Sequence, residues 1–141
     1  MDNLLFEKIW QDTELMQLRV LCSSSIAMAC TEIYVNEILL NELIDNLKLF
    51  LAGRTDGCIW ANETRGNGST ACLELRFIKQ DKLGHVLIEV FAELDDGGEY
   101  SKHNSCFYIK TEMGLLGSFC AKLENLKLMD PLGFQVELND V

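Results

Sequence analysis

Two runs of alternating apolar and polar residues constrain the fold of this chain more than any other feature. The runs are residues 71–79 and 85–94, and Asp81-Lys82-Leu83-Gly84 separates them as a turn. The apolar set is Leu73, Leu75, Phe77, Val86, Ile88, Val90, Ala92 and Leu94. A period of two is typical of a strand with one buried and one wet face, so the runs predict an antiparallel hairpin.

Further strands are expected on both sides of this hairpin. Residues 15–22 and 26–35 flank Ser23-Ser24-Ser25 and predict a second hairpin. Shorter strands are expected at residues 58–61, 105–110 and 134–138. Residues 4–10 fit either a short helix or an extended arm.

Two segments have the apolar spacing of amphipathic helices. The first is residues 37–51, where Asn36 is a suitable N-cap and Gly53 a stop signal. The second begins at Thr111 and Glu112 and ends near Leu126. Its two glycines, 114 and 117, each weaken the helix by about 1 kcal/mol relative to Ala and are expected to allow close packing on the sheet.

The order of these elements predicts the fold class. Strands and helices do not alternate strictly, which argues against a parallel sheet. We expect one α+β domain over residues 1–141, with a mostly antiparallel, twisted sheet of six or seven strands. Both helices are expected to cover one face of that sheet.

The charge balance bears on the class of partner. Twelve Lys and Arg residues oppose 22 Asp and Glu residues, for a net charge of −10. Such a surface repels nucleic acid and anionic membranes and attracts basic proteins. The apolar stretches are too short to span a membrane, and the acidic N-terminus does not resemble a secretory signal. We therefore expect a cytoplasmic protein with a basic protein partner and no nucleic-acid or membrane role.

No motif indicates a cofactor or a metal. The six cysteines include no Cys-x-x-Cys pair and are expected to be reduced and buried. His103 and Cys106 lack a second pair of ligands at zinc spacing. Gly66-Asn67-Gly68-Ser69 precedes a strand and no Lys-Ser or Lys-Thr follows it, so it is a turn and not a phosphate loop. No cofactor is expected.

A cluster of carboxylates is the candidate partner-binding site. Its members are Glu89, Glu93, Asp95, Asp96 and Glu99. They fit a glycosidase acid–base pair or a calcium loop poorly. A solvated strand face is the plainest interpretation, and a flat acidic patch for a protein partner is the functional one. His85 is expected at a turn and His103 in a structural loop, although His103 next to Ser105 or Cys106 leaves a small enzyme open as an alternative.

Several of these segments together resemble the WapI-type immunity proteins of bacteria. The resemblance covers roughly residues 14–126. It lies in Trp60, the Gly66-Asn67 loop, Leu73-x-Leu-x-Phe77, the segment from Asp81 to Val90, Asp95-Asp96-Gly97-Gly98 and His103-Asn104-x-Cys106-Phe107. It implies a protein that binds and neutralises a cognate toxin, often a nuclease, without turnover. The acidic composition fits that expectation, because the phosphate-binding cleft of a nuclease is basic.

Two other functions remain open from the sequence. One is a non-enzymatic binding or regulatory module, which could form a homodimer through an exposed strand edge. The other is a small enzyme that uses His103 or the carboxylates of residues 89–99.

Overall fold

The alternating runs form strands and the two helical patterns form helices in the computed structural model, which describes residues 2–64, 71–95, 102–127 and 131–139. The strands are β1 (Asn3–Gln11), β2 (Met16–Ser23), β3 (Met28–Val35), β4 (Gly57–Ala61), β5 (Cys72–Lys79), β6 (His85–Asp95), β7 (Lys102–Glu112) and β8 (Gln135–Glu137). The helices are α1 (Glu37–Leu51) and α2 (Met113–Leu123), and a 3-10 turn, η1 (Glu124–Leu126), follows α2.

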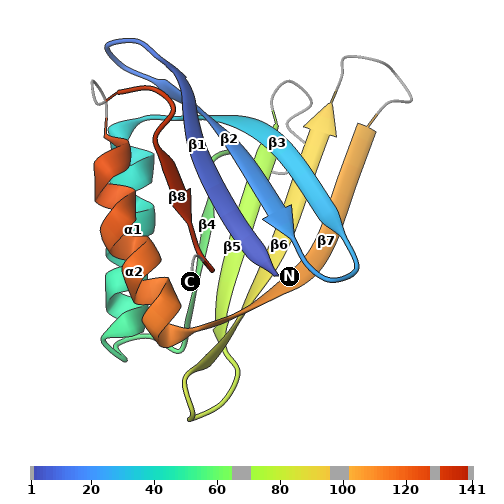
Figure 1. Ribbon diagram of the computed structural model, residues 1–141, viewed down its shortest axis with the longest axis vertical. Coiled ribbons are helices and arrows are strands. Elements are labelled where there is room, and N and C mark those ends of the chain that lie inside the picture. The colour runs from blue at the N-terminus through green and yellow to red at the C-terminus, as the bar shows by residue number, and fades with distance from the viewer. Residues whose placement is uncertain (1, 65–70, 96–101, 128–130, 140–141) are drawn as a thin grey trace.

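The strands make two antiparallel sheets of four and not the single sheet that the sequence suggested. One sheet has the order β3-β2-β1-β8 and the other β4-β5-β6-β7 (Figure 1). The prediction of a single sheet is wrong because each hairpin has one apolar face, and both faces are buried when the sheets stack on each other. The α+β class is confirmed.

The segment that the sequence left undecided is strand β1. Leu4 and Phe6 are fully buried, and Phe6 lies opposite Val20 of β2. On its other side β1 pairs with β8, so the C-terminal strand completes the first sheet.

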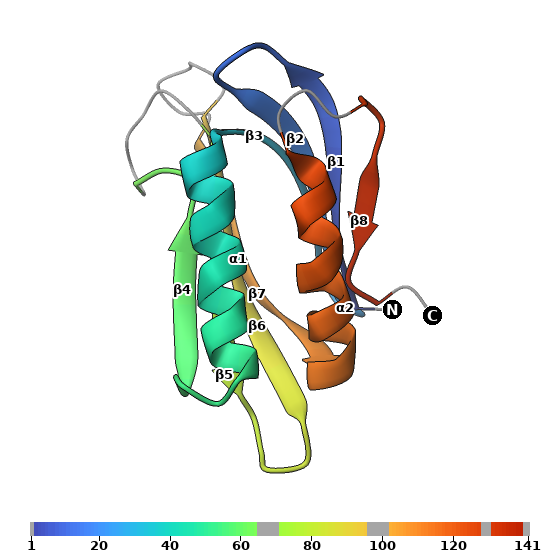
Figure 2. The same ribbon diagram turned by 90° about the vertical axis from the view of Figure 1, so that its left-hand side faces the viewer.

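The helices lie side by side and close one open side of the sandwich (Figure 2), so the prediction that both cover one face of a single sheet is wrong. Asn36 caps α1 as predicted, because its Oδ1 accepts a hydrogen bond of 2.8 Å from the N–H of Leu39. Gly53 follows the helix with a φ of +74°, the left-handed conformation that glycine adopts without strain. Lys48 of α1 and Glu124 form an ion pair of 2.9 Å that links the two helical segments.

Helix α2 differs from its prediction at both its start and its glycines. Thr111 and Glu112 remain in β7, opposite Val86 and His85 of β6, so the helix begins at Met113. The expected close packing at the glycines is wrong: a Cβ built on Gly114 or Gly117 meets nothing within 4 Å.

The cysteines are all free thiols, and three of them are buried: Cys22, Cys72 and Cys120. Burial raises the pKa of Cys22 to about 12. The expectation that all six are buried is wrong for Cys30 and Cys106, which are exposed on the edge strands β3 and β7. Neither helix of the described segments has the length and apolarity needed to span a membrane.

Candidate protein-binding surface

The carboxylates expected to bind a partner lie on and after β6. Glu89 and Glu93 point to the outer face of the second sheet and are half-buried. The side chain of Asp95, and Asp96 and Glu99 as a whole, lie outside the described residues. The structure therefore places two of the five predicted residues on one face.

The surroundings of Glu89 are not uniformly acidic. Its cross-strand neighbours are Arg76 on β5 and Tyr108 on β7. The Tyr108 hydroxyl donates a hydrogen bond of 2.8 Å to Glu89 Oε2, and this bond raises the pKa of Tyr108. Glu89 thus already has a partner within the sheet, which leaves less of its charge for an incoming protein.

Strand geometry separates some of the residues that the enzyme alternative needs. The expectation that His103 lies in a loop is wrong, because His103 belongs to β7. Cys106 is three positions away and points to the opposite face of the sheet, whereas Ser105 is two positions away and shares the face of His103. Glu89 and Glu93 are four positions apart, which is about 13 Å along a strand, farther than the roughly 5–9.5 Å of glycosidase carboxylates. Among the described residues no group of three His, Cys, Asp or Glu side chains is arranged to hold a metal.

His85 lies at the turn between β5 and β6, as expected. Its Nδ1 lies 2.6 Å from Asp81 Oδ2. Asp81 Oδ1 also accepts the backbone N–H of Leu83, and the bond from His85 is the main reason that the pKa of Asp81 is lowered. The pair fixes the turn in which it lies.

The sequence analysis missed a second surface at the tip of the β1–β2 hairpin. We call it the hairpin surface and define it by Trp10, Asp12, Glu14, Leu15 and Tyr34. Trp10 and Tyr34 are 42% and 47% exposed, and their rings meet edge to face with centroids 6.2 Å apart. Exposed aromatic pairs are common in the energetic centre of protein interfaces.

A β-bulge turns Trp10 onto this surface. Phe6 and Lys8 are even-numbered residues of β1 whose side chains are buried, and regular alternation would bury residue 10 as well. The register shifts between Lys8 and Trp10, so that Trp10 lies opposite the outward-facing Gln17. A bulge of this kind re-aims a side chain without ending the strand.

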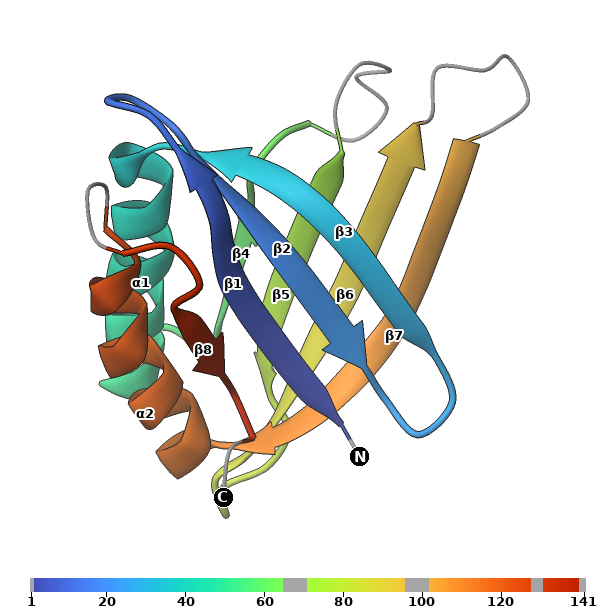
Figure 3. The same ribbon diagram turned by 45° about the horizontal axis from the view of Figure 1, so that its top comes forward.

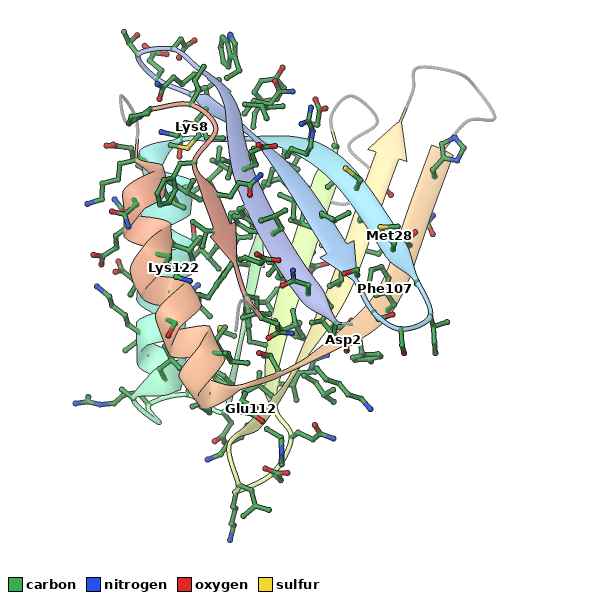
Figure 4. All side chains as sticks on the ribbon, viewed as in Figure 1. Asp2, Lys8, Met28, Phe107, Glu112 and Lys122 are labelled. Carbon is green, nitrogen blue, oxygen red and sulfur yellow. The ribbon has the colours of Figure 1, made fainter. Side chains whose placement is uncertain are left out.

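The buried Lys8 anchors the chain beneath the bulge (Figure 4). Its Nζ donates hydrogen bonds to the carbonyl of Lys127 and to Gln11 Oε1, the latter at 3.2 Å. The backbone of Lys8 also bonds to Gly133 and Phe134. These bonds tie the base of the hairpin to the chain segments around it.

Asp12 gives the hairpin surface a fixed negative charge. Its Oδ1 accepts the backbone N–H groups of Leu15 at 2.7 Å and Glu14 at 2.8 Å. The bond from Leu15 and then that from Glu14 lower the pKa of Asp12, so its carboxylate is ionised at neutral pH.

Carboxylates predominate in the segments that form the hairpin surface. Residues 9–18 and 32–42 meet at this end of the molecule and contain five carboxylates and no Lys or Arg. The nearest described cation on the outer face of the first sheet is Arg19, which lies 3.3 Å from Glu7 and 3.5 Å from Glu32. Arg19 thus partly neutralises Glu32, and an incoming basic group meets the other four carboxylates of these segments.

Fold and surface together define an α+β sandwich with a flanking helix pair and an acidic surface that carries exposed aromatic side chains. Comparison of the chain with protein-family models, with curated proteins and with solved structures gave no significant match.

Proposed function

We propose that this protein is an immunity-type binding protein that neutralises a toxin by covering a basic site, without turnover. The observation that carries the proposal is the hairpin surface, where exposed aromatic rings adjoin the carboxylates of two segments, residues 9–18 and 32–42, that contain no Lys or Arg. The resemblance of residues 14–126 to WapI-type immunity proteins supports the same function.

The chemistry of the hairpin surface suits a basic protein partner. Carboxylates steer a basic partner and speed association, whereas buried aromatic side chains slow dissociation. Arg or Lys side chains of the partner gain a further contact on the rings of Trp10 and Tyr34. A nuclease domain offers such cations in its phosphate-binding cleft, and an occupied cleft is closed to substrate.

The carboxylates of residues 89–99 remain a second part of this proposal. The end of β6 that carries Glu93 lies at the same end of the molecule as the β1–β2 hairpin (Figure 1). A partner that covers this end is therefore attracted by both groups of charges.

The first experiment uses the protein as bait for secreted toxins of its native bacterium, with mass spectrometry as the readout. Capture of the C-terminal toxin domain of a large secreted protein, and loss of its toxicity when bound, would support the proposal. Association with that domain is then measured at low and high salt.

Variants with neutral side chains test which carboxylates speed association with the toxin domain. Asp12→Asn with Glu14→Gln keeps the hydrogen-bond acceptor of the turn but removes two charges, and we expect association at low salt to slow roughly tenfold. Asp45→Asn with Asp56→Asn removes the same charge elsewhere and is the matched control, and Glu93→Gln tests the second group. Equal association rates for all these variants and the wild type would contradict the electrostatic mechanism.

A further inference from the structure

Three of the four sheet edges are protected against pairing with another chain. Strand β4 lies against α1, where the Trp60 indole donates to the carbonyl of Leu39 at 2.9 Å. Strand β8 has three residues and lies against α2. On β7 the N–H of Lys110 donates to Asp2 Oδ2 at 2.7 Å, and Lys110 is itself an edge lysine. Short edges, covering helices and edge lysines are the usual devices that prevent sheet-to-sheet association.

Among the described residues, none of these protections is found on strand β3. It runs for eight residues along the outer margin of its sheet (Figure 3). Its sequence, Met-Ala-Cys-Thr-Glu-Ile-Tyr-Val, contains no Lys, Arg or Pro. Met28, which is 68% exposed, and Tyr34 point to the outer face beside this edge.

The hydrogen-bond pattern of the β2–β3 hairpin identifies the free backbone groups. At the turn the N–H of Ser24 donates to the carbonyl of Ala27 at 2.8 Å. In an antiparallel pair bonded positions alternate, so residues 29, 31, 33 and 35 bond to β2. The N–H and C=O groups of residues 28, 30, 32 and 34 therefore point away from β2, along the open edge.

We propose that an extended, basic segment of the partner adds to β3 as a further strand. This inference rests on the proposed function and deepens it by naming how the partner docks. Strand addition satisfies the four outward residues of β3 with main-chain hydrogen bonds. Because Tyr34 belongs both to β3 and to the hairpin surface, the added strand continues directly into that surface.

The negative charge of this protein favours a basic partner, and not a second copy of this chain, as the strand that pairs with β3. Arg or Lys side chains on the outer face of the added strand lie next to Glu32 and Tyr34, and apolar ones lie over Met28 and Cys30. Pairing β3 with itself instead brings together two chains of net charge −10.

The probe is a synthetic peptide of about ten residues with alternating Arg and Val, long enough to cover an eight-residue strand. The matched control is the same peptide with Pro at two central positions, which keeps the charge but cannot pair. Hydrogen exchange at single amides is followed by NMR. We expect the alternating peptide to slow exchange at residues 28, 30, 32 and 34 but not at 29, 31 and 33, and the control to slow none.

A pair of protein variants tests the same edge. Cys30→Pro removes an N–H that faces the open edge, whereas Cys30→Ala removes only the thiol. We expect Cys30→Pro to weaken peptide binding roughly tenfold or more and Cys30→Ala to leave it unchanged. If Cys30→Pro does not fold, the comparison of the two peptides on the wild-type protein tests the strand addition by itself.

Each remaining outcome has one meaning. Unchanged exchange of the four amides with the alternating peptide overturns the inference. Protection that appears without peptide and grows with protein concentration also overturns it, because a second copy then occupies the edge. If a toxin is captured but leaves these amides unprotected, the strand addition is rejected and the proposed function is kept. If the peptide protects the edge but no toxin is captured, β3 still accepts a basic strand and the proposed function is rejected.

Discussion

Single residues decide which side chains lie on the surface of this protein. The β-bulge at Lys8 and Trp10 inverts the alternation of β1, so that a tryptophan that a regular strand would bury lies on the surface beside Tyr34. Sequence alternation predicts faces only while the register is regular, and nothing in residues 3–11 marks a bulge. The carboxylates of residues 89–99 could be recognised as a cluster because they lie in one short stretch of sequence. The hairpin surface could not, because strand pairing brings residues 10–15 together with residue 34.

A buried hydroxyl gives a prediction at the same scale. Thr31 is 2% exposed, and its Oγ1 has no hydrogen-bond partner among the described residues. Thr31→Val keeps the shape and removes the unsatisfied group, so we expect the free energy of unfolding to rise by about 1 kcal/mol. Urea denaturation followed by circular dichroism measures it.

The matched control is a threonine whose hydroxyl is bonded. Thr111 Oγ1 donates to Asn139 Oδ1 at 2.8 Å, so Thr111→Val is expected to lower the free energy of unfolding by about 1 kcal/mol. If both valine variants shifted the denaturation midpoint in the same direction, the hydrogen-bonding state of the threonine hydroxyl would not determine the effect on stability.

Elements with explicit end signals were predicted best. Asn36 and Gly53 mark the two ends of α1, and the Asp81–Gly84 turn marks the end of β5 and the start of β6. Helix α2 lacks a side-chain cap hydrogen bond at its start, so the sequence did not show where β7 ends. In both hairpins the period-two pattern predicted the buried face, since Leu75, Phe77, Val20 and Val90 are fully buried.

The glycines of α2 make a prediction about this element. No neighbour lies within 4 Å of a Cβ at Gly114 or Gly117, so each Gly→Ala change adds helix propensity without a clash. We expect each to raise the free energy of unfolding by roughly 0.5–1 kcal/mol. Chemical denaturation of both single variants and of the double variant is the measurement.

Gly57 supplies the opposite case. A Cβ there would lie 2.9 Å from the carbonyl oxygen of Phe77 on the neighbouring strand, and a backbone atom of a sheet cannot move aside easily. Gly57→Ala is expected to lower the free energy of unfolding by about 1–3 kcal/mol. If Gly57→Ala were as stable as Gly114→Ala, close backbone packing at β4 would be excluded.

At the scale of the whole molecule, the sequence predicted the α+β class but not the division into two sheets. Strand patterns show which residues are buried, but not whether an apolar face meets a helix or another sheet. The pairing of β1 with β8 joins residues 128 to 132 positions apart, and local patterns contain no information about such a contact.

Acid stability is a property of the whole molecule because the responsible carboxylates lie in different places. Hydrogen bonds from Leu15, from His85 and from Lys48 lower the pKa values of Asp12, Asp81 and Glu124, respectively. A folded-state pKa below the unfolded value stabilises the fold above the unfolded pKa, and this stability is lost as the pH falls through the folded pKa. We therefore expect the thermal midpoint to fall as the pH decreases below about 4.

Thermal unfolding between about pH 5 and pH 2 tests this expectation. The variant Asp12→Asn, Asp81→Asn and Glu124→Gln is the control, and its midpoint should depend less on pH in that range. A wild-type midpoint that stays constant down to the lowest pH would contradict the assignment.

The pairing of β1 with β8 has a consequence for engineering. Asn139 donates its backbone N–H to Asn3 Oδ1 at 3.0 Å, so both ends of the described chain leave the fold at one place (Figure 1). A short Gly-Ser linker from the last residues to the first closes the chain into a ring, and new ends opened between β5 and β6 give a circular permutant with every strand pair retained. Fluorescent or affinity domains joined at those new ends would lie away from the hairpin surface.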